Sequence, residues 1–302
     1  MYIRDIFSSK KPVISFEVFP PKKDSSIDTI YSTIDALADL HPDFISVTYG
    51  AGGSASGKTV ELASIIKNKY NIEALAHLTC VTSTKSEIEA ILDKLTANNI
   101  TNILSLRGDF PTEGDYKFPS SVQYEHADDL IRHIKSTGDF SIGAACYPEG
   151  HIECKDKSLD LFHLKNKVQV GSDFLITQLF FNNEDFYIFM DQIKSIGINV
   201  PVSAGIMPVI NKKQIERITA LCGASVPNKF KRILDKYENN PEALKEAGIA
   251  YATEQIIDLL SWGIDGIHIY TMNKPEIARK IVNNIASIRN VLEKEPPAAA
   301  VQ

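Results

Sequence analysis

Glu17 is the first residue whose surroundings point to chemistry. It stands near the end of a short apolar segment, residues 13–21 (VISFEVFPP), which two prolines terminate. The β-branched and aromatic residues predict a strand, and the apolar neighbours Phe16 and Val18 disfavour an edge strand with Glu17 in solvent. A carboxylate in such a setting is costly unless it is paired, protonated or functional. Glu17 is therefore a candidate acid–base group.

A second candidate is the run Arg107-Gly108-Asp109, which follows an apolar stretch. An arginine fork can hold a phosphate or a carboxylate, and glycine lets backbone approach a ligand. The alternative is a surface turn stabilised by a pair between Arg107 and Asp109. The residue types predict an anion site but do not exclude the turn.

A third group shares one predicted helix face. Asp160, His163 and Lys167 are spaced i, i+3 and i+7, and His151 lies just before that helix. Such a face is more often solvated than functional, so both interpretations stay open here.

Residues 52–59 (GGSASGKT) fit the phosphate-loop pattern G-x-x-x-x-G-K-[ST] letter for letter. A weak dinucleotide pattern, Gly50-x-Gly52-x-x-Ala55, overlaps it, but the acidic residue expected to end the next strand, Glu73, begins it instead. No apolar segment ends in an aspartate that could serve magnesium. We expect Lys58 to belong to no phosphate site, so Lys58→Ala should leave activity unchanged.

Composition excludes several classes of protein. The 302 residues are 44% hydrophobic and 23% charged, and 32 basic against 38 acidic residues give a net charge of −6, which disfavours a general nucleic-acid or anionic-membrane surface. We see neither a membrane-spanning run nor a signal-peptide core. Four cysteines without C-x-x-C spacing predict a reducing cytoplasm. Cys146, His151 and Cys154 lack a fourth zinc ligand at suitable spacing, so no metal is expected.

Short apolar segments alternate with helix-like stretches along most of the chain. This alternation predicts an α/β protein, a (β/α)8 TIM barrel in one domain over residues 1–292, with a disordered tail at 293–302. The expected strands are 13–19, 44–49, 73–79, 101–106, 140–146, 173–180, 200–206 and 265–271. The expected helices are 27–40, 58–70, 85–98, 123–137, 158–170, 184–196 and 275–292, with two or three extra helices at 211–262, before the last strand. Apolar helix faces in a barrel of this size also favour a homo-oligomer.

In a barrel the active site lies at the carboxyl ends of the strands. Reading those ends in order gives a ring of mostly polar residues: Glu17, Thr48 and Tyr49, His77 and Thr79, Arg107 and Asp109, Cys146 and Tyr147, Gln178, Met207, and Tyr270 to Asn273. The ring predicts convergent chemistry. The alternative is that strand ends are simply wetter than strand middles.

Taken together, several segments resemble methylenetetrahydrofolate reductase of the short bacterial type, in order from about residue 13 to residue 290. They are ISFEVFPPK (14–22), FISVTYGAGGS (44–54), HLTC (77–80), LSLRGDFP (104–111), YPEGH (147–151) and ITQLFF (176–181). The resemblance implies an FAD-bearing barrel that reduces 5,10-methylenetetrahydrofolate to 5-methyltetrahydrofolate with NAD(P)H, for one-carbon metabolism and methionine supply. It also implies a ping-pong order through the flavin, and it makes the G-K-T ending of the phosphate-loop pattern accidental.

The resemblance assigns roles residue by residue. Glu17 matches the general acid, which opens the folate ring by protonating a ring nitrogen, and an ionised Asp109 would stabilise the resulting cation. The flavin-contacting positions are Thr48, Tyr49, His77, Arg107, Gly108, Asp109, His126, Ala127, Tyr147, His151, Asp160, His163, Asn166 and Lys167. The folate-contacting positions are Asp109, Gln178, Tyr270 and Lys274.

The sequence departs from the family pattern at several of these positions. Lys274 replaces a usual arginine, so a bidentate carboxylate contact would become a point charge. His163 and Asn166 replace an asparagine and an arginine, His126 replaces a tyrosine, and Lys212 replaces an aromatic residue. The larger eukaryotic members add a regulatory domain that we do not expect here. Two other functions stay open: a related FAD barrel resembling proline dehydrogenase, and a phosphate-loop nucleotide hydrolase.

Overall fold

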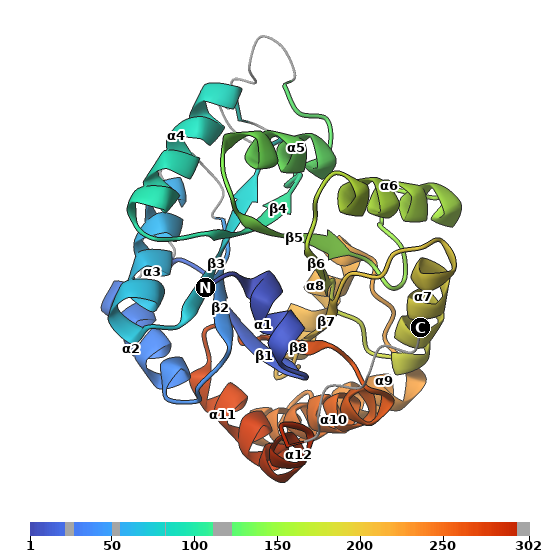
Figure 1. Cartoon of the computed structure of the whole chain (residues 1–302). Helices are drawn as coiled ribbons and strands as arrows, with labels where there is room; N and C mark the ends of the chain where they lie inside the picture. Colours follow the sequence, from blue (N-terminus) through green and yellow to red (C-terminus); the bar gives the residue numbers. More distant parts are fainter. Residues whose placement is uncertain (22–26, 50–54, 82, 111–122, 295–302) are drawn as a thin grey trace.

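A closed barrel of parallel strands organises the molecule (Figure 1). The computed structural model describes residues 1–21, 27–49, 55–81, 83–110 and 123–294. Within them, eight strands pair in chain order, and β8 closes the ring against β1. The strands are β1 (Val13–Val18), β2 (Phe44–Val47), β3 (Glu73–Thr79), β4 (Asn102–Leu106), β5 (Ser141–Cys146), β6 (Phe174–Thr177), β7 (Val202–Ile206) and β8 (Gly266–Tyr270). The predicted (β/α)8 barrel is confirmed.

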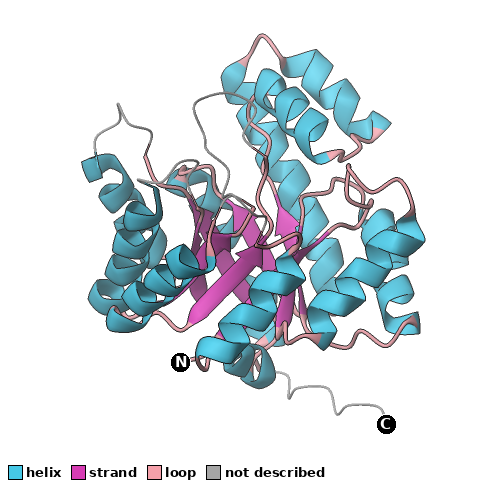
Figure 2. Ribbon diagram, turned by 90° about the horizontal axis from the view of Figure 1, so that it is seen from above, coloured by secondary structure: helices cyan, strands magenta, loops and turns pink. Residues whose placement is uncertain are grey.

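Helices surround the strands (Figures 1 and 2). Those described are α1 (Ile3–Ser9), α2 (Ile27–Ala38), α3 (Ala55–Tyr70), α4 (Lys85–Ala97), α5 (Ala127–Thr137), α6 (Lys157–Gln169), α7 (Asn183–Ser195), α8 (Lys212–Cys222), α9 (Asn228–Tyr237), α10 (Pro241–Trp262), α11 (Pro275–Asn284) and α12 (Ala286–Leu292). The extra helices predicted before the last strand are α8, α9 and α10. The single helix predicted over 275–292 is instead two, which meet at Ile285.

Alternation along each strand separates two cores. Phe16 and Val18 of β1 face the helices and belong to the large cluster between barrel and helix ring. Inside the barrel, a smaller cluster contains Phe44, Leu104 and Phe174. The barrel interior is therefore packed with side chains at one end, which leaves the other end for polar groups.

Three aspartates fix neighbouring strands in register. Asp43, one residue before β2, accepts a hydrogen bond from the backbone N–H of Ile14 in β1 (2.7 Å). Asp173 before β6 does the same for Ile142 of β5 (2.7 Å), and Asp265 before β8 for Val202 of β7 (2.9 Å). Each carboxylate thus satisfies an N–H near the start of the preceding strand, where the ladder begins.

Helix α1 closes the amino-terminal end of the barrel, and the sequence did not predict it. Its Ile3, Ile6 and Phe7 join the inner cluster, and the Phe7 ring lies 5.4 Å from that of Phe174. The backbone N–H of Ile3 donates to the side chain of Asn102 on β4 (2.8 Å). In Figure 1 the helix lies in front of the central strands. The carboxyl ends of the strands therefore form the open mouth.

Two remaining expectations concern the ends of the chain and the membrane. Glu293, the first residue of the predicted tail, forms ion pairs with Lys10 (3.1 Å) and Arg289 (2.7 Å), and residues 295–302 lie outside the described part. Among the described helices, none combines the length and apolar character needed to cross a bilayer.

Candidate active site

Glu17 points into the barrel near its mouth. It pairs laterally with Ser46 on β2 and with Tyr270 on β8, and its side chain is 18% exposed. Its apolar sequence neighbours Phe16 and Val18 lie on the opposite face of β1. The apolar sequence neighbours predicted an apolar environment for Glu17. That prediction was wrong, because the side chains around this carboxylate are polar.

Two histidines flank the Glu17 carboxylate. Its Oε2 lies 3.5 Å from Nε2 of His77 and 3.8 Å from Nε2 of His268. Burial lowers the pKa of His77 to about 4 despite the opposing effect of Glu17, and its Nε2 is buried without a hydrogen-bond partner in the described structure. His77 is therefore neutral near pH 7, so it contacts Glu17 as a dipole and not as a counter-ion.

His268 is fully buried beneath Glu17, and the sequence interpretation missed it. Its Nδ1 lies 2.7 Å from the hydroxyl of Ser15, and its Nε2 lies 3.3 Å from the hydroxyl of Ser46. The two serines fix the orientation of the imidazole plane. Only strand ends were read for chemistry, whereas His268 stands inside its strand, two residues before Tyr270 and therefore on the same face.

Tyr270 lies across the barrel because Gly205 leaves it room. Its hydroxyl donates to the backbone carbonyl of Thr177 on β6 (2.7 Å). A Cβ at Gly205 would lie 2.7 Å from the Tyr270 ring and 2.3 Å from the same carbonyl. Burial raises the pKa of the Tyr270 hydroxyl, and Glu17 adds to the effect. Tyr270 is therefore a neutral hydrogen-bond donor that bridges β8 to β6.

The segments after β1 and β8 are joined just above Glu17. The Asn273 side chain accepts from the N–H of Phe19 (3.1 Å) and donates to its carbonyl (2.9 Å), while Thr271 donates to the carbonyl of Glu17 (2.6 Å). Asn273 adopts φ +54°, a conformation that asparagine tolerates. Lys274 follows as an exposed residue at the start of α11.

Arg107, Gly108 and Asp109 stand at the rim, after β4. Arg107 Nη1 pairs with Glu153 (2.7 Å), so the predicted alternative of a pair between Arg107 and Asp109 is wrong. Gly108 has φ +85°, and a Cβ there would lie 2.9 Å from the Cβ of Thr79. Asp109 is exposed, and the structure does not bring it into contact with Glu17.

The predicted face of α6 turns toward β5 and the loop after it. Asp160 accepts from the N–H of His151 (3.2 Å), whose ring lies 4.6 Å from that of Tyr147. Lys167 Nζ donates to the carbonyl of Ala145 on β5 (2.6 Å) and lies 6.0 Å from the Tyr147 ring. Burial lowers the pKa of Lys167. Asp160 and Lys167 are thus held against β5 and the loop after it, which favours the functional interpretation over a solvated face.

His163 extends this rim toward α5. Its ring lies 5.2 Å from that of His126, the residue before α5, and Asn166 lies one turn further along α6. The carbonyl of Ala127 accepts from Ser105 on β4 (3.3 Å). The two imidazole planes are inclined by 50°, so they form an angled, polarisable pair on the α5–α6 side of the rim.

The remaining predicted positions lie on neighbouring strands. Thr48 follows β2, and its N–H bonds to the carbonyl of Val18 (3.0 Å), while Tyr49 packs partly buried against the outer core. Gln178 follows β6, and its N–H donates to the carbonyl of Cys146 (2.7 Å). The structure therefore distributes the predicted residues along the rim from β2 to β6 and on the neighbouring β8 and β1, except that the Tyr49 side chain packs against the outer core.

The described part of the phosphate-loop pattern does not form a phosphate site. Helix α3 begins at Ala55, so Gly57 and Lys58 are helical residues and not part of a loop before the helix. The Thr59 hydroxyl donates to the carbonyl of Thr48 (3.0 Å), where a phosphate loop would need it for magnesium. Residues 50–54, which include the rest of this pattern and of the dinucleotide pattern, lie outside the described residues.

No cluster of metal ligands is present in the described part of the chain. Cys146 is buried, and burial raises the pKa of its thiol to about 12, while Cys154 donates to the carbonyl of Asp156 (3.3 Å). Neither cysteine is arranged as a zinc ligand.

Comparison with known proteins decides the family. The model of the family described as methylenetetrahydrofolate reductase matches residues 2–286. This chain belongs to the methylenetetrahydrofolate reductase family. A 5,10-methylenetetrahydrofolate reductase of Pectobacterium carotovorum subsp. carotovorum is 36% identical over 272 residues, which cover 90% of this chain and 89% of the relative.

Two further matches delimit what the family membership implies. Methylenetetrahydrofolate reductase (NADH) 1 of Arabidopsis thaliana is 37% identical over 95% of this chain, but over only 50% of its own length. A Clostridium thermocellum protein described as binding two copies of 5-methyl-5,6,7,8-tetrahydrofolic acid shares the fold, with a TM-score of 0.61 and 18% identity over 96% of this chain and 100% of that one. The second match supports the barrel and nothing finer.

One departure from the reductase family pattern has a clear structural partner. The Lys212 ammonium, at the start of α8, pairs with Asp235 (2.8 Å) and Glu238 near the end of α9. Both contacts raise its pKa. Lys212 therefore fastens α8 to α9 in this reductase-family member, and its charge is already compensated there.

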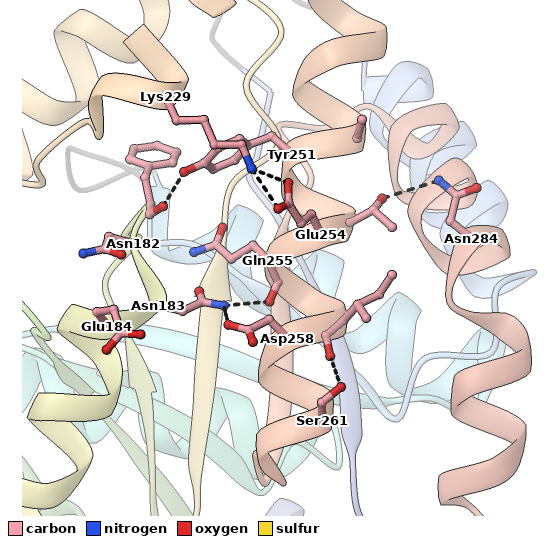
Figure 3. A pocket seen from close by; sticks show the side chains of 14 residues that line it. Asn182, Asn183, Glu184, Lys229, Tyr251, Glu254, Gln255, Asp258, Ser261 and Asn284 are labelled. Atoms are coloured by element: carbon pink, nitrogen blue, oxygen red, sulfur yellow. Dashed lines mark hydrogen bonds and ion pairs between the residues drawn. The ribbon is translucent and has the colours of Figure 1, made fainter. Parts of the chain in front are cut away.

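A cavity of about 790 Å³ lies outside the mouth of this reductase barrel, between the start of α7, α9 and α10 (Figure 3). Its polar groups largely bind one another: Lys229 pairs with Glu254 (2.7 Å), and Asn183 donates to Asp258 (2.6 Å). The Oδ1 of Asn183 is buried without a hydrogen-bond partner among the described residues. Because none of the residues near Glu17 lines this space, we interpret it as a surface groove and not as the active site.

Proposed function

We propose that this chain is an FAD-dependent reductase that converts 5,10-methylenetetrahydrofolate to 5-methyltetrahydrofolate, with NAD(P)H as the source of electrons and a ping-pong order. The observation that carries the proposal is Glu17, a carboxyl group at the bottom of the barrel mouth, in a chain whose family is defined by this reduction. The name of the Arabidopsis relative contains NADH, which supports NADH as the nucleotide.

The residues on the β4–β6 side of the mouth fit FAD. An anionic cofactor with a flat ring system needs cations and polarisable surfaces, and Arg107, Lys167, His126 and His163 supply both. Gly108, at φ +85°, keeps the backbone free of a side chain at this point. When bound there, FAD would supply the hydride chemistry that side chains lack.

We assign the proton transfer to Glu17. The ring nitrogen of the folate that bears the aminobenzoyl group must gain a proton before the five-membered ring opens to a cation. The neutral His77 beside Glu17 adds no positive charge that would hold the carboxyl group ionised. His268, fixed by its two serines, lies beneath the carboxyl group, with its Nε2 3.8 Å from Oε2 of Glu17.

We assign folate binding to Tyr270 and Lys274, on and after β8, and to Gln178 and Asp109 at the rim after β6 and β4. The Tyr270 hydroxyl already donates to Thr177 at the end of β6, so Tyr270 would offer its ring to the substrate, next to Gln178. Asp109 is exposed at the rim, where it would stabilise the cation. Lys274 would contact the substrate carboxylate as a point charge. We also propose a cytoplasmic location, from the free cysteines, and a homo-oligomer, which light scattering would test against the monomer mass of 33.5 kDa.

Glu17→Gln tests the proposal most directly. We expect flavin reduction by NADH to stay almost intact, while folate reduction slows by about 10²–10⁴-fold, because only the second half-reaction needs the proton. Stopped-flow absorbance of the flavin measures both half-reactions. Equal losses in the two half-reactions would contradict the assignment, and oxidation of NADH coupled to proline in place of the folate would favour the related FAD barrel.

A further inference from the structure

Glu153 holds the guanidinium that we assign to the cofactor site. Its Oε2 lies 2.7 Å from Arg107 Nη1. The Glu153 side chain is 55% exposed, whereas that of Arg107 is 22% exposed. The hydrogen bond from Arg107 lowers the pKa of Glu153, so the carboxylate stays charged at neutral pH.

The backbone of the loop that carries Glu153 is fixed independently of this ion pair. The N–H of Glu153 donates to Nδ1 of His151 (3.2 Å), and the N–H of His151 donates to Asp160 (3.2 Å). The exposed side chain can therefore change rotamer without unfolding the loop.

The position of Arg107 is equally fixed. Its carbonyl accepts from the N–H groups of Cys80 (3.1 Å) and Val81 (2.8 Å), and its Nε donates to the carbonyl of Gly108 (3.2 Å). A guanidinium edge binds carboxylate and phosphate oxygens in the same geometry. Glu153 engages Nη1, so a phosphate cannot bind both terminal nitrogens of that edge while the ion pair lasts.

We propose that Glu153 is an internal competitor for Arg107, which must release the guanidinium before the diphosphate of FAD can bind it. The inference rests on the proposed function, because FAD is the anion in question. Glu153 thereby lowers the affinity for the cofactor and raises the rate at which the cofactor exchanges. It touches Arg107 and not the reacting atoms, so it regulates binding and does not catalyse.

Titration of the apoprotein with FAD, followed by flavin fluorescence, tests the inference. Glu153→Gln keeps the size of the side chain and removes its charge. We expect this variant to bind FAD about twofold to fivefold more tightly, the range of an exposed ion pair. Riboflavin has no phosphate, so its affinity should not change.

Two controls separate competition from a general effect on the loop. Glu149 lies in the same loop, but its carboxylate accepts from the N–H of Ser225 (3.0 Å), so Glu149→Gln should leave the affinity for FAD unchanged. In an Arg107→Gln background, Glu153→Gln should lose its effect, because the contested group is gone.

Three results would overturn the inference: unchanged FAD affinity in Glu153→Gln, weaker FAD binding, or equal tightening for riboflavin. Weaker binding would mean that Glu153 orients Arg107 toward the cofactor. If the unaltered protein bound no FAD, the proposed function itself would fall, together with this inference. Unchanged affinity in the variant beside an FAD-binding parent contradicts the inference alone.

Discussion

His77 and His268 give the Glu17 carboxyl group an environment that differs from both bulk water and an apolar core. One imidazole is held by two serines, and the other is buried with an unsatisfied nitrogen. An unsatisfied buried nitrogen costs free energy, and such groups are retained where they serve a site. We therefore regard His77 as a residue whose cost to stability is offset by its place beside Glu17.

A fall in pH should destabilise the folded protein through His77. The pKa of His77 is about 4 in the folded protein against 6.5 ordinarily, so the unfolded chain binds the proton first as the pH falls. The free energy of unfolding should fall by about 3 kcal/mol through His77 between pH 6.5 and about 4, and His77→Gln should lose this contribution. Urea unfolding at several pH values measures it. His41→Asn, at an exposed histidine, should keep the parental pH dependence, and equal slopes in all three proteins would contradict the prediction.

At the scale of elements, helix α10 and the loop after β7 touch through a glycine. A Cβ at Gly248 would lie 1.7 Å from the carbonyl oxygen of Val209. The helix therefore lies directly against the backbone of a segment that leads from the barrel mouth. Its distance from the barrel is set by the absence of a side chain at this position.

Gly248→Ala should therefore destabilise the protein, although alanine favours helices. We expect a loss of about 1–3 kcal/mol in the free energy of unfolding, because helix propensity returns only about 1 kcal/mol. Gly57→Ala in α3 is the matched control, since no described atom beyond its own helix backbone and chain neighbours lies within 4 Å of its added Cβ. It should stabilise by up to about 1 kcal/mol. Denaturant unfolding of both variants measures this. Stabilisation by both alanines would refute the close contact.

The order of elements could be predicted from sequence, and some of their parts could not. Alternating apolar runs indicate strands because local patterning determines them, and reading their ends located the rim. Helix α1 escaped because its bonds reach Asn102 and Ser141, far along the chain. His268 was not predicted as a site residue, because a histidine inside a strand is interpreted as a core residue until it is known which face of the sheet it occupies.

The three aspartates that fix the strand register have a recognisable position in the sequence, although we did not predict their role. Each stands immediately before its strand, in PDFISV (42–47), SDFLIT (172–177) and IDGIHI (264–269). A charged residue preceding an apolar run reads as a loop residue unless the neighbouring strand is known. The repeated position of Asp43, Asp173 and Asp265 would have indicated the register between each strand and the one before it.

At the scale of the whole molecule, one end of the barrel contributes to stability and the other end holds the candidate active site. The amino-terminal end is closed by α1, whose Phe7 ring packs with Phe44 and Phe174 in a cluster of three mutually contacting rings. The groups near Glu17 all lie toward the other end. Stability and chemistry should therefore respond to different substitutions.

Phe7→Ala should cost about 3–5 kcal/mol in the free energy of unfolding, because it leaves a cavity among buried rings. The KM for the folate should hardly change, since no residue of the mouth loses a contact. Ile188→Ala, at an exposed position on α7, should change stability by less than about 0.5 kcal/mol. Unfolding curves and steady-state kinetics test both. A large rise in KM with little loss of stability would contradict this division.

The closure of one end of the barrel by α1 also determines how ligands enter and leave it. A tube with both ends open could admit one molecule while another left by the far side. Here side chains fill the amino-terminal end of the barrel, so Glu17 can be reached only from the mouth. A ligand that reaches Glu17 must therefore leave through the mouth by which it entered before another ligand can take its place.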